Sequence, residues 1–150
     1  MIKHFTATGI LVTGIIPKKI LLGLHNKLNV WLPPGGHIEE NENSTESVIR
    51  EVLEETGFDV RPYIPEEKRL DDRVVLLLQP DYILEEIIPP HGETEAHAHL
   101  DLNYIFTVPE FVPVFPKREY KDMQWFTKEE ALQLPTFVNI KEFYLPKVLK

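Results

Sequence analysis

The segment GHIEENENSTESVIREVLEETGF, residues 36–58, constrains the fold of this chain more than any other stretch. It begins with a polar loop and continues with apolar residues three or four positions apart, which is the spacing of an amphipathic helix. Asn43 or Ser44 can cap the start of this helix, because their side chains accept hydrogen bonds from its first N–H groups. Gly57 can adopt the left-handed conformation that ends a helix. The sequence therefore predicts a helix over residues 44–56.

The two faces of this helix differ in character. At about 100° per residue, one face collects the apolar side chains that we expect to be buried, namely Val48, Ile49, Val52 and Leu53. Glu51, Glu54 and Glu55 have the i, i+3, i+4 spacing of neighbours on a helix surface, where like charges repel. Grouped carboxylate oxygens are the ligands that a hard divalent cation such as Mg²⁺ prefers. A solvated acidic helix face is the alternative interpretation of these three residues alone.

The spacing of residues around the helix is specific. Five residues separate Gly36 from Glu42, and seven separate Glu42 from the pair Arg50-Glu51. The pattern continues with Val52, Leu53, Glu54, Glu55, Gly57 and Phe58. In spacing and residue types, this segment resembles the signature of the Nudix hydrolases. The resemblance implies an α/β (α+β) fold, an α/β/α sandwich with a mixed β-sheet between helices, formed as a single domain over residues 1–150.

The resemblance also implies an activity. Nudix hydrolases cleave a diphosphate (pyrophosphate) linkage in nucleoside diphosphates joined to another moiety, and they use a divalent metal ion that activates water. By this resemblance the cofactor is Mg²⁺, with Mn²⁺ as a substitute, held by Glu51, Glu54 and Glu55 and by a backbone carbonyl of Gly35 or Gly36. The partner is then a small-molecule nucleotide-diphosphate substrate, whose other moiety the signature does not specify.

The family pattern implies a role for each residue that matches it. Glu51 and Glu55 match the main metal ligands, and Glu54 matches a ligand or the base that orients water. Arg50 and Glu42 match residues that hold the loop against the helix. The candidate catalytic set is therefore Glu42, Arg50, Glu51 and Glu54. Some members of the family take an additional base from a later loop, for which the candidates here are Glu93, Glu95 and Glu119.

Composition argues against several other classes of protein. No run of about 18 apolar residues is present that could span a bilayer, and the N-terminus lacks the features of a secretory signal. The chain has no cysteine, so it offers neither a disulfide framework nor a thiol nucleophile, and we expect a cytoplasmic protein. The net charge of −8 argues against partners held by phosphate neutralisation, such as duplex nucleic acid or an anionic membrane.

The rest of the chain predicts more strands than helices. Apolar runs bounded by turn residues favour strands over 4–14, 18–25, 30–32, 58–63, 73–79, 82–88, 99–108 and 118–126. A sharp turn is expected over 33–36. Thr127 can open a short helix, and a terminal helix over 138–150 should be interrupted or ended near Pro146. We expect the residues that determine substrate specificity to lie in the loops at 64–72 and 89–98.

One predicted strand carries a polar face. His99, Asp101 and Asn103 alternate with apolar residues, and His91 and His97 precede them. Histidines and an aspartate can hold zinc, but this spacing matches no tight ligand motif and no cysteine assists. A strand edge that faces substrate is a second interpretation. Solvated polar residues on a half-exposed strand are the default interpretation.

Proteins of two other classes share the implied fold. Isopentenyl-diphosphate isomerases use an active-site cysteine, which this chain lacks. A non-catalytic, metal-dependent nucleotide-binding or regulatory module is the other alternative, although such modules usually have a damaged signature and all the glutamates are present here. The oligomeric state is open, because the segment FVPVFP at 111–116 and the strands within 82–108 could form a homodimer interface or could cover the core.

Overall fold

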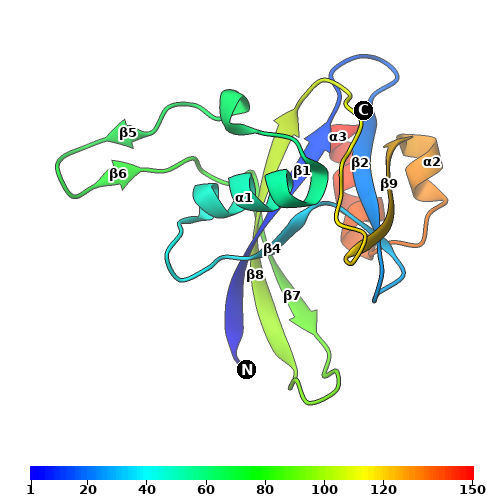
Figure 1. The fold of residues 1–150 in the computed structure, drawn as a ribbon, viewed down its shortest axis with the longest axis horizontal. Coiled ribbons are helices and arrows are strands. Elements are labelled where there is room, and N and C mark those ends of the chain that lie inside the picture. The colour runs from blue at the N-terminus through cyan, green and yellow to red at the C-terminus, as the bar shows by residue number, and fades with distance from the viewer.

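The computed structural model describes all residues, 1–150, and shows a mixed β-sheet with helices on both faces (Figure 1). The central strands β1 (Lys3–Val12) and β8 (His97–Thr107) run parallel. Strand β2 (Lys19–His25) pairs antiparallel with β1, and β7 (Tyr82–Ile88) pairs antiparallel with β8. The expected sandwich with a mixed sheet is therefore confirmed.

Three further strands complete the sheet. Strand β3 (Trp31–Leu32) and strand β9 (Tyr120–Thr127) both pair with β2, and β4 (Gly35–His37) pairs with β1. The sharp turn predicted over 33–36 is therefore wrong in its second half, since both glycines belong to β4. Their backbone pairs with β1 in register, and this pairing holds the glycines at a fixed position beside the first helix.

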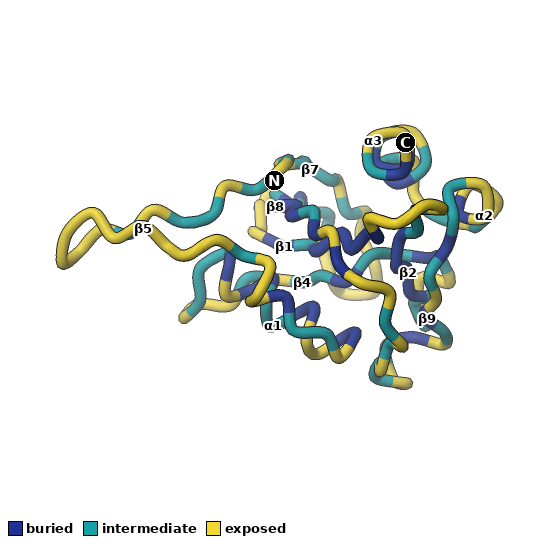
Figure 2. Tube along the Cα trace, turned by 90° about the horizontal axis from the view of Figure 1, so that it is seen from above, coloured by how far each residue is buried: buried dark blue, intermediate teal, exposed yellow.

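Helix α1 (Ser44–Thr56) has the predicted bounds and covers one face of the sheet (Figure 2). Asn43 is the N-cap, and its side chain accepts a hydrogen bond from the N–H of Glu46. The Glu46 side chain accepts from the Asn43 N–H in return, which completes a capping box. Gly57 ends the helix with a φ of 79°, in the left-handed region that glycine adopts without strain.

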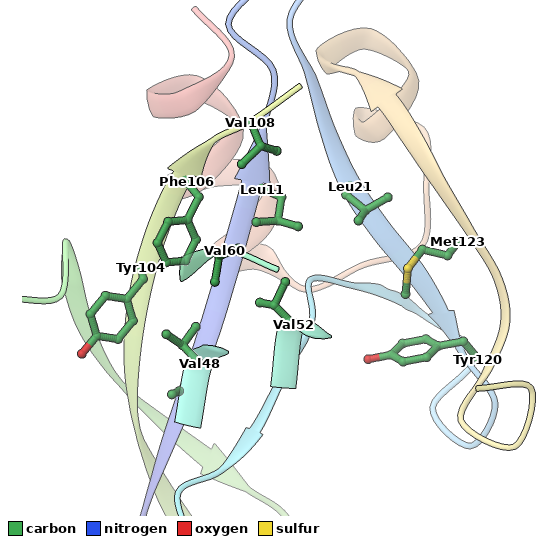
Figure 3. Packing of buried hydrophobic residues seen from close by; sticks show 11 residues of the cluster. Leu11, Leu21, Val48, Val52, Val60, Tyr104, Phe106, Val108, Tyr120 and Met123 are labelled. Carbon is green, nitrogen blue, oxygen red and sulfur yellow. The ribbon is translucent and has the colours of Figure 1, made fainter. Parts of the chain in front are cut away.

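The buried face of α1 differs from the face that the apolar pattern predicts, because it includes polar residues. Val48 and Val52 are fully buried in a cluster with β1, β2 and β9 (Figure 3). Leu53 is 45% exposed, so its predicted burial is wrong. Glu51 and Glu55 are buried instead, because β4 and the start of β9 lie against their side of the helix.

The other face of the sheet is covered by the C-terminal part of the chain. Helix α2 (Lys128–Leu132) starts at the capping box of Thr127, as predicted. The terminal helix consists of a π-helical segment (Asn139–Tyr144) and α3 (Leu145–Val148), and Pro146 lies in the first turn of α3. None of the helices combines the length and the apolar character needed to cross a bilayer. A second apolar cluster lies beneath these helices and includes Ile10, Val12, Ile20, Leu22, Ile140 and Leu145.

A hairpin of β5 (Lys68–Arg69) and β6 (Val75–Leu76) protrudes from the body of the protein (Figures 1 and 2). The buried strand predicted over 73–79 is wrong, because only Val75 and Leu76 form a strand, in this hairpin, and no residue of the run is buried. The strand predicted over 58–63 is also wrong. That stretch ends in a 3₁₀ turn (Arg61–Tyr63), whose proline has no N–H to donate to a sheet.

Candidate active site

The side chain of Glu51, on helix α1, packs against the backbone of β4. Glu51 as a whole is only 9% exposed. The neighbouring backbone belongs to Gly36, where an added Cβ would lie 2.5 Å from Oε1 of Glu51. Glycine is therefore the residue that leaves room for the carboxylate at this close approach.

Glu55 lies one helical turn further along α1 and is 6% exposed. Its Oε1 accepts a hydrogen bond from the Gly35 N–H at 2.8 Å, and its Oε2 accepts one from the Tyr120 hydroxyl at 3.0 Å. Burial, helped by the neighbouring carboxylates of Glu119 and Glu51, raises the pKa of Glu55 to about 9. The two hydrogen bonds orient this carboxyl group but bring no positive charge to it.

Arg50 ties the loop before α1 to the helix. Its Nη2 lies 2.6 Å from Oε1 of Glu42, and its Nε donates to Oε2 of Glu42 at 3.0 Å. Nη2 also donates to the backbone carbonyl of His37 at 3.2 Å. Nη1 lies 3.1 Å from Glu51 and 3.3 Å from Glu54. The hydrogen bonds from Arg50 lower the pKa of Glu42 to about 2, so this pair stays ionised at neutral pH.

The candidates for a base lie in different places. The side chain of Glu54 is 59% exposed on the outer side of α1. Glu119 is half-buried directly before β9 and lies close enough to Glu55 to perturb its pKa by side-chain contact. Glu93 and Glu95 are exposed in the turn between β7 and β8, outside the lining of the cavity described next. Of the three later glutamates, only Glu119 adjoins the helix carboxylates.

A cavity of about 710 Å³ opens beside Glu55. Gly35, Gly36 and Glu55 line one part of it, and the other walls include residues of β1, β7, β8, the segment from β2 to β3 and the C-terminal helical segment. Ligand pockets in proteins have volumes of roughly 300–1,000 Å³. The cavity is therefore large enough for a small organic substrate that reaches Glu55.

The polar face of β8 lines the same cavity. Asp101 and Asn103 are 6% and 1% exposed, so the interpretation of these residues as solvated is wrong. Asp101 accepts hydrogen bonds from the hydroxyls of Thr6 and Thr8 at 2.8 and 2.9 Å. On the adjacent strand, burial and the nearby charge of Asp101 raise the pKa of Glu86 to about 7. The cavity wall therefore carries three acidic groups, those of Glu55, Glu86 and Asp101.

A model of the family described as NUDIX domain matches residues 4–147. This chain belongs to the Nudix family. The m7GpppN-mRNA hydrolase NUDT17 of Danio rerio is 53% identical to the Nudix chain over 34 residues, which are 23% of the chain and 11% of that relative. The chain therefore spans only a small part of the length of this relative.

Longer similarity is found with other Nudix relatives. The bis(5'-nucleosyl)-tetraphosphatase (asymmetrical) of Mus musculus is 28% identical over 123 residues, which are 81% of this chain and 72% of that protein. The crystal structure of a hydrolase of the NUDIX family from Clostridium perfringens superposes with a TM-score of 0.67 at 26% identity. That match covers 99% of this chain and 97% of the other.

Sequence reasoning missed several groups of this Nudix site. They are Thr6, Thr8, Glu86 and Tyr120. The two threonines alternate with apolar residues within the first predicted strand, which was a signal for a polar patch on one face. Tyr120 gives no such signal, since only the pairing of β9 with β2 brings its hydroxyl to Glu55.

Proposed function

We propose that this Nudix chain hydrolyses a diphosphate linkage in a nucleoside diphosphate derivative, with Mg²⁺ as cofactor and Mn²⁺ as a substitute. The observation that supports this best is the position of Glu55, a buried carboxyl group without a cationic partner at the wall of a large cavity. The name of the mouse relative makes dinucleoside tetraphosphates the first substrates to test.

The residues at this site fit a hard divalent cation. Glu51 and Glu55 are buried carboxyl groups, and burial raises the pKa of both. Buried carboxylates are costly unless a positive charge compensates them, and oxygen donors are what Mg²⁺ prefers. The candidate ligands are Glu51, Glu54, Glu55 and a backbone carbonyl of Gly35 or Gly36. When bound, such a cation supplies positive charge to diphosphate oxygens and acidifies water.

The side chains around these ligands have supporting roles in the proposal. The Gly35 N–H and the Tyr120 hydroxyl hold the two oxygens of Glu55 in one orientation. Arg50 and Glu42 join the loop after β4 to helix α1. This contact keeps Gly35 and Gly36 next to the carboxyl groups of Glu51 and Glu55. Two groups are proposed to accept a proton from the attacking water, Glu54 on the exposed side and Glu119 on the buried side.

The test is product release from a panel of substrates in the presence of Mg²⁺. The panel contains dinucleoside polyphosphates, nucleoside triphosphates, ADP-ribose and nucleotide sugars. We expect turnover of one group and a loss of about 10²-fold or more in Glu55→Gln, which is the scale for removal of one electrostatic group from an active site. The matched control is Glu129→Gln, which removes an exposed helical glutamate on α2.

Two results would separate this proposal from its alternative. Equal turnover by the wild type and Glu55→Gln would remove Glu55 from the mechanism. Failure to turn over any substrate, with metal-dependent nucleotide binding retained, would indicate the non-catalytic binding module instead. Several properties stay predictions from the sequence: the single-domain organisation, the cytoplasmic location and the lack of duplex nucleic acid and membrane partners. The choice between a monomer and a homodimer stays open.

A further inference from the structure

Four of the six histidines gather at one end of the sheet, and we refer to them as the histidine cluster: His4, His37, His97 and His99. One ring nitrogen from each of His4, His37 and His99 lies within 4.8 Å of the other two. Nε2 of His97 lies 3.2 Å from Nε2 of His99. The cluster is thus a convergence of imidazole nitrogens, outside the carboxylates of α1.

The strand pairing alone accounts for this convergence. His4 is directly opposite His99 in the parallel pair of β1 and β8. On the other side of β1, His37 is opposite Thr6, and Thr6 shares a face of the strand with His4. His97 shares a face of β8 with His99 for the same reason. The cluster is therefore anchored in three adjacent strands rather than in a loop.

One nitrogen–nitrogen distance in the cluster already matches that of a tetrahedral ion. Zinc binds histidine nitrogen at about 2.0–2.1 Å, so the ligand nitrogens of a tetrahedral site are roughly 3.3–3.4 Å apart. The separation of 3.2 Å between His97 and His99 is close to this value. His4 and His37 are exposed, so their side chains have room to turn inward and close the larger separations.

One member of the cluster already has the hydrogen bond expected of a metal ligand. Nδ1 of His97 lies 3.1 Å from the backbone carbonyl of Glu95. Metal-binding histidines usually donate their other ring N–H to a carbonyl or carboxylate, which fixes the tautomer. With Nδ1–H donated to Glu95, the lone pair of Nε2 faces His99 and the rest of the cluster.

We propose that the histidine cluster binds a borderline divalent cation, of which Zn²⁺ is the first candidate, at a site separate from the α1 carboxylates. His4, His37 and His99 supply three ligands, and His97 supplies the fourth. Imidazole donors suit Zn²⁺, Cu²⁺ and Ni²⁺, whereas Mg²⁺ prefers oxygen. Because His37 and His99 also line the large cavity, a bound ion would place positive charge at its rim.

The test is Zn²⁺ binding to the full chain by calorimetry, in excess Mg²⁺ and without nucleotide. Omitting nucleotide makes the result independent of the proposed hydrolase activity. We expect one site per chain in the wild type, with the affinity reduced at least tenfold in His4→Ala and in His99→Ala. This scale follows from the roughly 10–100-fold cost of losing even an outer partner of a metal ligand. The matched control is His91→Ala, because His91 is exposed in the turn between β7 and β8, outside the cluster.

A second measurement locates the ion. Co²⁺ bound to the cluster should give the visible absorption of a tetrahedral site, and this absorption should persist in Glu55→Gln and disappear in His99→Ala. Zinc affinity that survives both histidine substitutions would overturn the proposal. Zinc binding that is lost in Glu55→Gln but retained in His99→Ala would assign the ion to the α1 carboxylates and would overturn the proposal. An absence of zinc binding to the wild type would also overturn it.

Discussion

Replacing Gly36 by alanine adds one methyl group where β4 touches Glu51. On the present backbone, the new Cβ would lie 2.5 Å from Oε1 of Glu51, 2.8 Å from its Cδ and 3.1 Å from its Oε2. Ordinary van der Waals contact begins at 3.4 Å, so Oε1 must move by about 0.9 Å, the difference between 3.4 and 2.5 Å. The substitution therefore displaces a proposed metal ligand without altering its chemistry.

The expected effect falls on catalysis rather than on stability. A misplacement of about 1 Å in an active site can lower the rate by roughly 10²-fold, so we expect kcat/KM to fall by about that factor. The φ of Gly36 is not in the left-handed region, so the strand accepts alanine. Alanine also reduces the entropy of the unfolded chain, worth about 0.4–1 kcal/mol, which offsets the cost of moving a flexible side chain. We therefore expect Tm to change by about 4 °C at most.

The assay combines steady-state kinetics over a range of Mg²⁺ concentrations with thermal unfolding. Gly14→Ala is the matched control, because its Cβ would meet only a methyl group of Thr107, at 3.1 Å. The control should retain wild-type kinetics. Wild-type kcat/KM in Gly36→Ala would refute the argument that the fit between β4 and Glu51 sets the position of the carboxylate.

Two further predictions concern stability. Leu21 is fully buried, so Leu21→Ala should lower the free energy of unfolding by about 2–5 kcal/mol. Leu53 is half exposed, so Leu53→Ala should change this free energy by only about 0.5 kcal/mol. Urea unfolding measures both values, and equal losses would contradict the assigned burial. Arg50 lowers the pKa of Glu42 from 4.5 to about 2, so the ionised carboxylate stabilises the fold above pH 4.5 and this contribution is lost as the pH falls toward 2. Glu42→Gln should therefore be less stable at pH 7 and should lose less stability between pH 4.5 and 2, and a urea midpoint that follows the wild-type pH profile would contradict this reasoning.

The sequence was informative wherever structure is determined locally. Asn43 and Gly57 define the two ends of α1 through hydrogen bonds and backbone conformations within one turn of the helix. The pairing of Arg50 with Glu42 likewise joins residues of one short segment. These features depend little on the rest of the fold, and the bounds predicted for the helix are confirmed.

Burial that depends on distant segments could not be predicted in this way. Leu53 continues the apolar pattern of α1 but is 45% exposed, whereas β4 and β9 cover the carboxyl group of Glu55. The apolar run at 73–79 has the composition of a core strand. Only Val75 and Leu76 of this run form a strand, and they pair within the protruding hairpin rather than with the sheet.

The histidines illustrate the same limit at the level of a site. The sequence draws attention to His91, His97 and His99, which are neighbours along the chain. The structure excludes His91 from the cluster and adds His4 and His37, which are remote in sequence. No local spacing encodes this set, because it arises from the pairing of β1 with β4 on one side and with β8 on the other.

The parallel pairing of β1 with β8 has a consequence for the order of folding. Each residue of β1 pairs with the residue 95 positions later, from Lys3 with Ala98 to Val12 with Thr107. A ribosome adds about 5–20 residues per second, so roughly 5 to 20 seconds separate the synthesis of the two strands. Until then, β1 can pair only with β2 and β4. The cavity and the histidine cluster require both central strands, so they form only after this pairing across 95 residues has closed.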